Sequence, residues 1–170
     1  MVPTGMTGPS APQPAPGASA TLELARADIG FSAAHFSVID GAVERLHGHN
    51  YRVLLRARGV VRTDGTVIDF HALKEALRTV CADLDEHMLL PTQSAVLSVE
   101  PSDSDVRVRA GAKHYAFPAD DVRLLPITNT TCECLAAYLL AAVRGHLGAA
   151  PVRLELGVEE LPGQGASVEE

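Results

Sequence analysis

The sequence has no long apolar run, and no stretch approaches the roughly 20 consecutive apolar residues that a membrane-spanning helix needs. We therefore do not expect a membrane protein. Basic residues are also few: 14 Lys and Arg stand against 21 Asp and Glu, which gives a formal net charge of −7. Because nucleic-acid backbones are bound by clustered Lys and Arg, a nucleic acid is not the expected main partner.

Cysteine is scarce as well. The three cysteines, Cys81, Cys132 and Cys134, are odd in number and form no C-x-x-C motif. This pattern argues against a disulfide framework and against a cysteine-rich zinc knuckle. We expect a reducing, cytoplasmic environment.

The N-terminal segment lacks charge. Residues 1–20 hold five of the eleven prolines and no charged side chain. Such a segment cannot bury enough apolar surface to offset its chain entropy, so we predict a disordered tail over residues 1–20. It has neither the basic start nor the apolar stretch of a signal peptide. Residues 21–170 are expected to form a single domain.

Hydrophobic patterning after the tail predicts two strands and a helix. The stretch TLELARADIGFSAAHF, residues 21–36, is apolar enough to form one half-buried strand. In the next strand, polar side chains occupy one parity, and the other parity is mostly apolar: His49, Tyr51, Val53, Leu55 and Ala57. Asp69 can then cap a helix that ends near His87.

A second helix and a last strand follow towards the C-terminus. TTCE predicts a capping box between Thr130 and Glu133, and Gly148 is a natural end for the helix that follows. In PVRLELGVEE the apolar residues share one parity, and Glu160 continues that inward-facing parity.

The order of these elements predicts an α+β fold. Between the helices, SDVRVRAGAKHYAFP predicts a hairpin that turns at Gly111 and could be an insertion over residues 96–118. The rest favours an antiparallel four-stranded sheet with two helices on one face. The uncovered face then needs water or a partner subunit.

Two histidines stand one residue apart at the start of the second strand. Residues i and i+2 of an extended segment point the same way, so His47 and His49 can converge on one point, with only Gly48 between them. His35, at the end of the first strand, is the candidate third ligand, because catalytic zinc commonly has three protein ligands. The alternative is that His47 and His49 are strand-end histidines bonded to backbone or water and that His35 is a core histidine.

Six motifs occur in the order found in one family: FSAAH, LHGHNY, VIDF followed by LK, LDEH with LL, NTTCE, and VEE. The chain resembles the family of 6-pyruvoyl-tetrahydropterin synthase and 6-carboxytetrahydropterin synthase, from about Thr21 to about Ser167 and without residues 93–118. The resemblance implies a tunnelling fold, in which three subunits join their sheets into a β-barrel and two trimers stack into a homo-hexamer. It also implies a small-molecule pterin as the partner.

The resemblance also implies a set of site residues. By it, the three histidines would hold Zn²⁺, and Glu160 would anchor the 2-amino and ring N–H edge of the pterin. Thr130 and Thr131 resemble adjacent residues that contact the pterin. The expected chemistry is rearrangement or cleavage of the three-carbon side chain of 7,8-dihydroneopterin triphosphate.

The chain departs from the commonest pattern of the family at its catalytic base. The cysteine expected four residues before the first histidine of H-G-H is Val43 here, and valine cannot transfer a proton. Glu44 beside it gives E-x-x-H-G-H, which resembles a glutamate-type branch associated with cutting the side chain to 6-hydroxymethyl-7,8-dihydropterin. A carboxylate can deprotonate the hydroxyl that a retro-aldol cleavage requires. The alternative for Glu44 is an exposed loop charge.

A second departure concerns the Asp-His pair that relays protons across a subunit boundary in the family. His87 keeps its candidacy as a general acid or base, but Glu86 precedes it where the family has aspartate, and Asp85 lies one residue further back. Glu86 could orient the imidazole, as carboxylates often do.

Three hypotheses follow. The favoured one is a zinc-dependent lyase that cleaves a pterin side chain. The second is a 6-carboxytetrahydropterin synthase of queuosine or another deazapurine pathway, with another group in place of the missing cysteine. The third is a pterin- or metal-binding paralogue without turnover.

Overall fold

The computed structural model describes residues 14–170. Most of the predicted tail, residues 1–13, lies outside the described residues. The first strand, β1 (Ser19–Leu24), begins two residues inside the segment predicted to be disordered. The amide of Gly17 donates to the carbonyl of Val61, and the amide of Val61 donates to the carbonyl of Ala18, which extends this pairing, so the predicted boundary at residue 20 is too late.

The central feature is a mixed sheet of seven strands. Six of them form a continuous order: β10 (Val122–Leu125), β6 (His87–Pro91), β2 (Gly30–His35), β5 (His47–Val60), β11 (Val152–Leu161) and β12 (Gln164–Glu169). The seventh, β1, pairs with β5. Because β6 is parallel to both β10 and β2, the predicted four-stranded antiparallel sheet is wrong in strand number and in direction.

The first predicted strand is in fact two strands, β1 and β2, that pair end to end along β5. Leu24 pairs with Leu55 and Gly30 with Arg52, so the five residues between Leu24 and Gly30 loop out over a gap of two on β5. The backbone approaches closely here: a Cβ on Gly30 would lie 2.1 Å from the carbonyl oxygen of Tyr51. The apolar run hid this break because both halves are partly buried.

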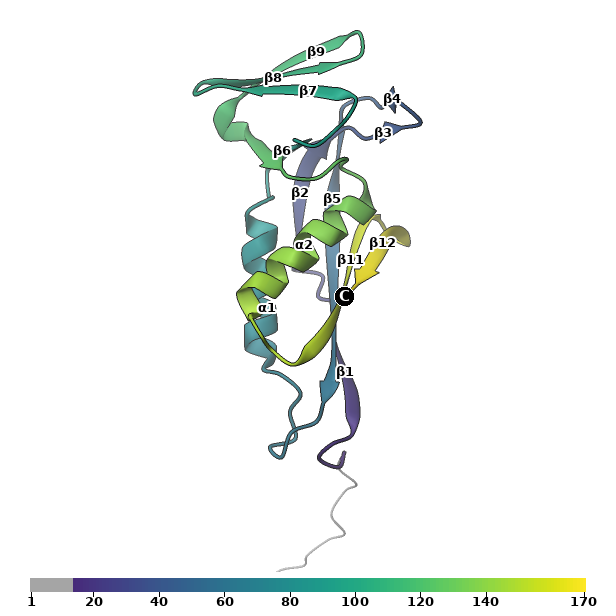
Figure 1. Cartoon of the computed structure of the whole chain (residues 1–170), viewed down its shortest axis with the longest axis vertical. Helices are drawn as coiled ribbons and strands as arrows, with labels where there is room; N and C mark the ends of the chain where they lie inside the picture. Colours follow the sequence, from purple (N-terminus) through teal and green to yellow (C-terminus); the bar gives the residue numbers. More distant parts are fainter. Residues whose placement is uncertain (1–13) are drawn as a thin grey trace, which may run out of the picture.

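Two helices cover one face of the sheet, as predicted (Figure 1). They are α1 (Phe70–Ala82) and α2 (Cys132–Leu147). Between them and the sheet lies the main core, to which β5 and β11 contribute their apolar parity: Tyr51, Val53, Leu55, Ala57, Val152, Leu154, Leu156 and Val158. The predicted inward parity of both strands is therefore confirmed, and so is the α+β class.

The helix ends follow the predictions in part. Asp69 caps α1 by accepting a hydrogen bond from the amide of His71, and Gly148, at φ 59°, ends α2. However, α1 ends at Ala82 rather than near His87. The capping box is also wrong: the N-cap residue is Thr131, which makes no side-chain cap bond, while the hydroxyl of Thr130 donates to Phe36 O at 3.2 Å.

The insertion is larger than a hairpin. The predicted pair, β8 (Asp105–Ala110) and β9 (Lys113–Pro118), turns at Gly111 with φ 65°, and β7 (Leu97–Pro101) adds a third antiparallel strand. We call this three-stranded unit the inserted sheet. It lies at one end of the molecule, next to the small hairpin of β3 (Val38–Ile39) and β4 (Ala42–Val43) (Figure 1).

The inserted sheet has a small core of its own. Its apolar face packs against β6, the start of β10 and the residue after β2, in a cluster of eight buried residues: Phe36, Met88, Leu90, Leu97, Val106, Val108, Ala110 and Val122. A short 3-10 helix (Ala119–Asp121) then leads into β10. The insertion is therefore packed onto the end of the main sheet rather than attached only through its ends.

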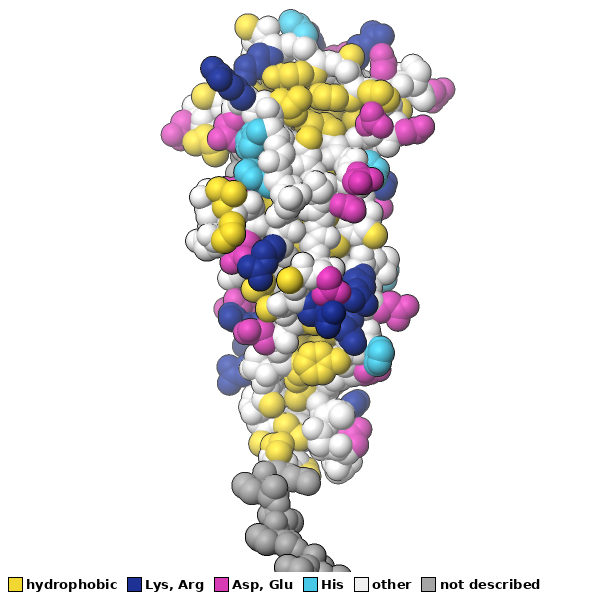
Figure 2. Space-filling view, turned by 180° about the vertical axis from the view of Figure 1, so that it is seen from behind, with side chains coloured by type: hydrophobic (Ala, Val, Ile, Leu, Met, Phe, Trp, Pro, Cys, Tyr) yellow, Lys and Arg dark blue, Asp and Glu magenta, His cyan; other side chains and the backbone are white. Residues whose placement is uncertain are grey.

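The face of the sheet opposite the helices carries charge. Arg52 pairs with Glu159, and Arg56 pairs with both Glu23 and Glu155. Seen from behind, the molecule shows basic side chains in dark blue with acidic side chains in magenta beside them (Figure 2). Alternating charges across neighbouring strands are favourable cross-strand pairs and suit a solvated surface. Within residues 14–170, no helix combines the length and apolar character needed to cross a membrane.

Candidate metal centre and pterin cavity

Three histidine side chains converge where β2 ends and β5 begins. His35 is the last residue of β2 and pairs with His47, the first residue of β5, while His49 follows on the same side of β5. Their candidate ligand nitrogens all lie within 4.8 Å of one another. The convergence that the H-x-H spacing predicted is therefore present.

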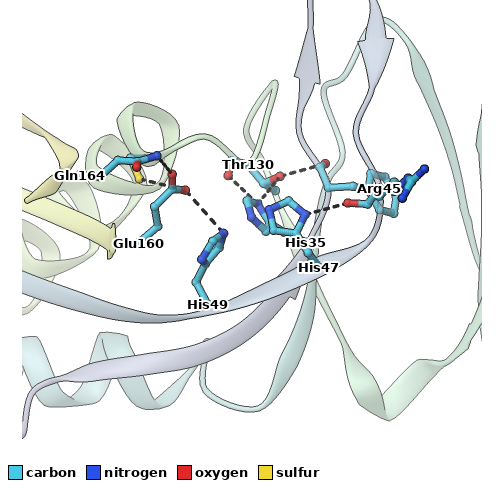
Figure 3. A network of polar contacts seen from close by, with 9 residues as sticks. His35, Arg45, His47, His49, Thr130, Glu160 and Gln164 are labelled. Atoms are coloured by element: carbon cyan, nitrogen blue, oxygen red, sulfur yellow. Dashed lines mark hydrogen bonds and ion pairs between the residues drawn. The ribbon is translucent and has the colours of Figure 1, made fainter. Parts of the chain in front are cut away.

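Backbone carbonyls orient two of the rings. Nδ1 of His35 lies 3.0 Å from the carbonyl oxygen of Thr130, and Nδ1 of His47 lies 2.7 Å from that of Arg45 (Figure 3). A carbonyl only accepts, so each Nδ1 carries the proton and each Nε2 keeps its lone pair. This is the usual arrangement behind a metal-binding imidazole.

The environment of His35 fits a metal ligand. Its side chain is 2% exposed, and its Nε2 has no hydrogen-bond partner. Burial, reinforced by the neighbouring His47, lowers the pKa of His35 to about 4, so the ring is neutral near pH 7. A buried, neutral nitrogen without a partner is costly unless something binds it, so the donor set fits a zinc-like cation.

Glu160 faces this triad from β11. Its Oε2 lies 3.8 Å from Nε2 of His49, and its Oε1 accepts a 2.6 Å hydrogen bond from Gln164 (Figure 3). In the hairpin with β12, Glu159 pairs with Gly165 and Leu161 with Gln164, so Glu160 is the extra residue of a β-bulge. Bulges commonly re-aim a side chain next to a site.

A cavity of about 260 Å³ lies next to two of the three histidines. The residues that line it include His35, Glu44, His47, Thr131, Cys132, Glu133, Glu160 and Gln164. Thr130 is not in this lining; it is fully buried behind His35, which its carbonyl orients. The structure therefore places Thr131 at the cavity and Thr130 behind the ring of His35.

Two cavity residues were missed by the sequence analysis. Gln164 lies on β12, a strand that was not predicted, and only the hairpin fold brings it to Glu160. Cys132 was considered but had no assigned place; its thiol lies 3.8 Å from Oε2 of Glu160. Burial and the nearby Glu160 raise the pKa of this thiol to about 11, which makes it a poor base at neutral pH.

His87 and Glu86 lie elsewhere. They line a second cavity of about 660 Å³, which His49 of the triad also lines, together with Phe117 and Asp121. Nδ1 of His87 is 2.6 Å from the backbone carbonyl of Asp85, so that carbonyl, rather than the Glu86 carboxylate, orients the ring. A single chain thus does not bring His87 into the cavity that contains Glu44.

The fold and the triad together define an α+β protein with three convergent histidines, a group that could hold a metal ion, at one end of its sheet. A family model described as 6-pyruvoyl tetrahydropterin synthase matches residues 25–170, and the chain belongs to this family. The resemblance noted from the sequence motifs is thereby confirmed.

Relatives point to two kinds of enzyme within the family. The chain is 32% identical over 145 residues to a putative 6-carboxy-5,6,7,8-tetrahydropterin synthase of Methanocaldococcus jannaschii, covering 82% of this chain and 89% of the relative. Among solved structures, it is 36% identical to 6-pyruvoyl tetrahydropterin synthase of Plasmodium falciparum, with a TM-score of 0.85 over 89% of this chain and 98% of that one. The Plasmodium vivax synthase is 35% identical, with a TM-score of 0.86 over 90% and 98%.

Proposed function

We propose that this protein is a zinc-dependent lyase that cleaves the side chain of 7,8-dihydroneopterin triphosphate to give 6-hydroxymethyl-7,8-dihydropterin. The observation that carries the proposal is that Glu44 lines the same cavity as Glu160 and two histidines of the triad, His35 and His47. Val43, at the position of the family's usual cysteine, can offer no base. The nearest side chain in the sequence that can accept a proton is Glu44.

Glu160 is the proposed anchor for the pterin ring. Two carboxylate oxygens can accept two parallel N–H bonds from the 2-amino and ring N–H edge, and the negative charge strengthens both. Gln164 holds Oε1 and so fixes the plane of the carboxylate. A pterin bound in this way extends its side chain towards the triad, because Glu160 and His49 are already within 3.8 Å.

His35, His47 and His49 are the proposed zinc ligands. Zinc bound there would supply a Lewis acid at the side-chain hydroxyls of the substrate. The chain itself orients two of these rings: the carbonyls of Thr130 and Arg45 accept from Nδ1 of His35 and His47, which leaves Nε2 of each ring open to a ligand.

Glu44 is the proposed general base. In a retro-aldol cleavage the base removes a hydroxyl proton, the freed electron pair forms a carbonyl bond, and the adjacent carbon–carbon bond breaks. The carbon left on the pterin then needs a proton. A carboxylate suits the first step, since it takes a proton from oxygen rather than from carbon.

His87 is the proposed proton donor for the last step, and it would come from another subunit of a homo-hexamer. Supporting this, His87 lies in a different cavity from Glu44 within one chain. Its Nδ1 is held by the Asp85 carbonyl, which leaves Nε2 free to carry a proton to a ligand.

The comparisons support a glutamate-type base. Two solved structures of the Plasmodium vivax synthase, each 34% identical to this chain, are of catalytic-residue mutants. In one a glutamate is replaced by alanine, and in the other by cysteine. The Plasmodium vivax synthase therefore has a catalytic glutamate.

A 6-carboxytetrahydropterin synthase is the second candidate, favoured by the name of the Methanocaldococcus jannaschii relative. It requires a group other than Glu44 to replace the absent cysteine. A binding paralogue without turnover is the third. All three share the triad and the Glu160 anchor, so product identity distinguishes them.

The test is to incubate the zinc-loaded protein with 7,8-dihydroneopterin triphosphate and to identify each pteridine by mass. Glu44→Gln, which keeps the shape but not the base, and His47→Ala are run beside it, with metal content measured for each. We expect 6-hydroxymethyl-7,8-dihydropterin from the wild type, and a loss of at least about 100-fold in rate for Glu44→Gln at full metal content. A carboxy product that survives Glu44→Gln would favour the second candidate, and unchanged substrate the third.

A further inference from the structure

The inserted sheet reaches the proposed catalytic segment through one side chain. Lys113 is the first residue of β9, directly after the β8–β9 turn. Its ammonium donates to the carbonyl oxygens of Val43 at 3.1 Å and Glu44 at 2.8 Å. Lys113 is one of only two lysines in the chain, and both of its bonds go to the two consecutive residues at the position of the base.

These bonds fix the backbone of Glu44 together with a bond to its amide. Its amide donates to the carbonyl of Ser37 at 3.0 Å, so both polar groups of its peptide backbone have partners outside the segment. The carbonyl of the next residue, Arg45, accepts from Nδ1 of His47. Hydrogen bonds to Lys113, to Ser37 and to the ring of His47 therefore fix the backbone from Val43 to His47.

A second contact fixes the inserted sheet itself in place. The ring of Tyr115, two residues after Lys113 and on the same side of β9, stacks on Phe36 with centroids 5.2 Å apart. Phe36 directly follows His35, and its carbonyl accepts the hydroxyl of Thr130. The strand that carries Lys113 is thus packed against the end of β2, next to the proposed metal ligand His35.

We propose that Lys113 is a positioning residue, through which the inserted sheet holds the Glu44 carboxylate at the cavity. This inference rests on the proposed function, since it assigns Lys113 the placement of the proposed base. An exposed loop residue would otherwise sample many positions, and a displacement of about 1 Å can cost roughly 100-fold in rate. A charge-assisted hydrogen bond to a backbone carbonyl is among the stronger ways to prevent this.

The test uses the full-length, zinc-loaded protein with Lys113→Met, Lys113→Arg and, as a matched control, Arg109→Met. Arg109 lies in the same inserted sheet but bonds to Ser98 and Glu100 on an exposed face. We expect Lys113→Met to lower kcat for the cleavage about tenfold with KM within about twofold, and Lys113→Arg, which can still donate, to recover most of it. Arg109→Met should leave both parameters unchanged.

Hydrogen exchange gives a readout that does not depend on activity. In Lys113→Met, peptides covering residues 42–46 should exchange faster, because the amide of Glu44 loses its fixed geometry, while metal content and the exchange of β5 stay as in the wild type. Normal kcat and unchanged exchange in Lys113→Met, with Glu44→Gln inactive, would overturn the positioning role and leave the proposed function standing. An active Glu44→Gln would instead overturn the proposed base, whatever Lys113→Met does to the exchange.

Discussion

At the scale of single residues, the NTTCE motif has three separate tasks. The side-chain amide of Asn129 bonds to both the N–H and the C=O of Val38, as a neighbouring strand would. The carbonyl of Thr130 orients His35, and Thr131 lines the cavity. The motif therefore links the start of α2 to the strand end that carries His35, which explains why its second residue is buried rather than free to cap the helix.

Glu160 allows a prediction about substrate binding. Glu160→Gln keeps the shape of the side chain but replaces one acceptor by a donor and removes the charge. Losing a hydrogen bond to a charged group costs about 1.5–3 kcal/mol, so pterin affinity should fall roughly 10- to 150-fold. Quenching of pterin fluorescence would measure it.

The control for this variant is the metal site. Because Glu160 is not among the three proposed ligands, zinc content measured by atomic absorption should not change in Glu160→Gln. Unchanged pterin affinity would argue against Glu160 as the anchor, and a simultaneous loss of zinc would instead indicate a role at the metal.

At the scale of elements, β5 joins the core to the site. Its C-terminal part packs under the helices and pairs with β1, while its N-terminal end carries two of the three histidines beside β2. The β11–β12 hairpin adds the opposite wall of the cavity, with Glu160 on the bulge and Gln164 at the start of the return strand. Stability of this hairpin should therefore affect binding.

Two glycine substitutions test that connection. Gly165 faces Glu159 across the hairpin, and a Cβ there would lie 2.2 Å from the carbonyl oxygen of Val158. Gly165→Ala must shift the two strands apart, so we expect a lower Tm and weaker pterin binding. The measurements are thermal unfolding and a pterin titration.

Gly145→Ala is the matched control. Gly145 lies within α2, with no atom within 4 Å of the position that a Cβ would occupy. Since alanine favours a helix over glycine by about 0.5–1 kcal/mol, this variant should be slightly more stable with normal binding. If Gly165→Ala binds pterin as tightly as Gly145→Ala does, the hairpin does not support the anchor.

At the scale of the whole molecule, the described chain leaves strand edges unpaired. Among residues 14–170, β10 and β12 end the sheet order, each with a neighbour on one side only. Open edges are templates for pairing with another chain. They agree with the proposed homo-hexamer, in which a second subunit would bring its His87 towards the cavity of the first.

Subunit mixing would test this shared site. We expect Glu44→Gln and His87→Ala each to form inactive oligomers. Unfolding and refolding the two variants together should restore a fraction of the wild-type rate, because some cavities then combine an intact Glu44 with an intact His87 from a neighbour. The rate of product formation is the measurement.

Each variant refolded alone is the control and should stay inactive. Sedimentation analysis of the mixture confirms that it assembled. No recovery in fully assembled mixed oligomers would show that one subunit supplies both groups, or that His87 takes no part.

The sequence by itself determined the features that depend on local spacing. The i, i+2 histidines share a side of β5, the inward parities of β5 and β11 decide which side chains enter the core, and Asp69 and Gly148 mark two helix ends. Each of these follows from the period of a strand or helix or from the chemistry of one residue. The family motifs, which are also local, identified the family.

Only the tertiary structure decided the features that depend on distant partners. It split residues 21–36 into two strands, placed β6 and β10 parallel to each other, and separated His87 from Glu44. It also gave the inserted sheet a contact with the proposed base through Lys113. None of these could be read along the chain, because pairing and packing energies depend on which segments meet in space, and Lys113 lies 70 positions from the Val43 carbonyl that it contacts.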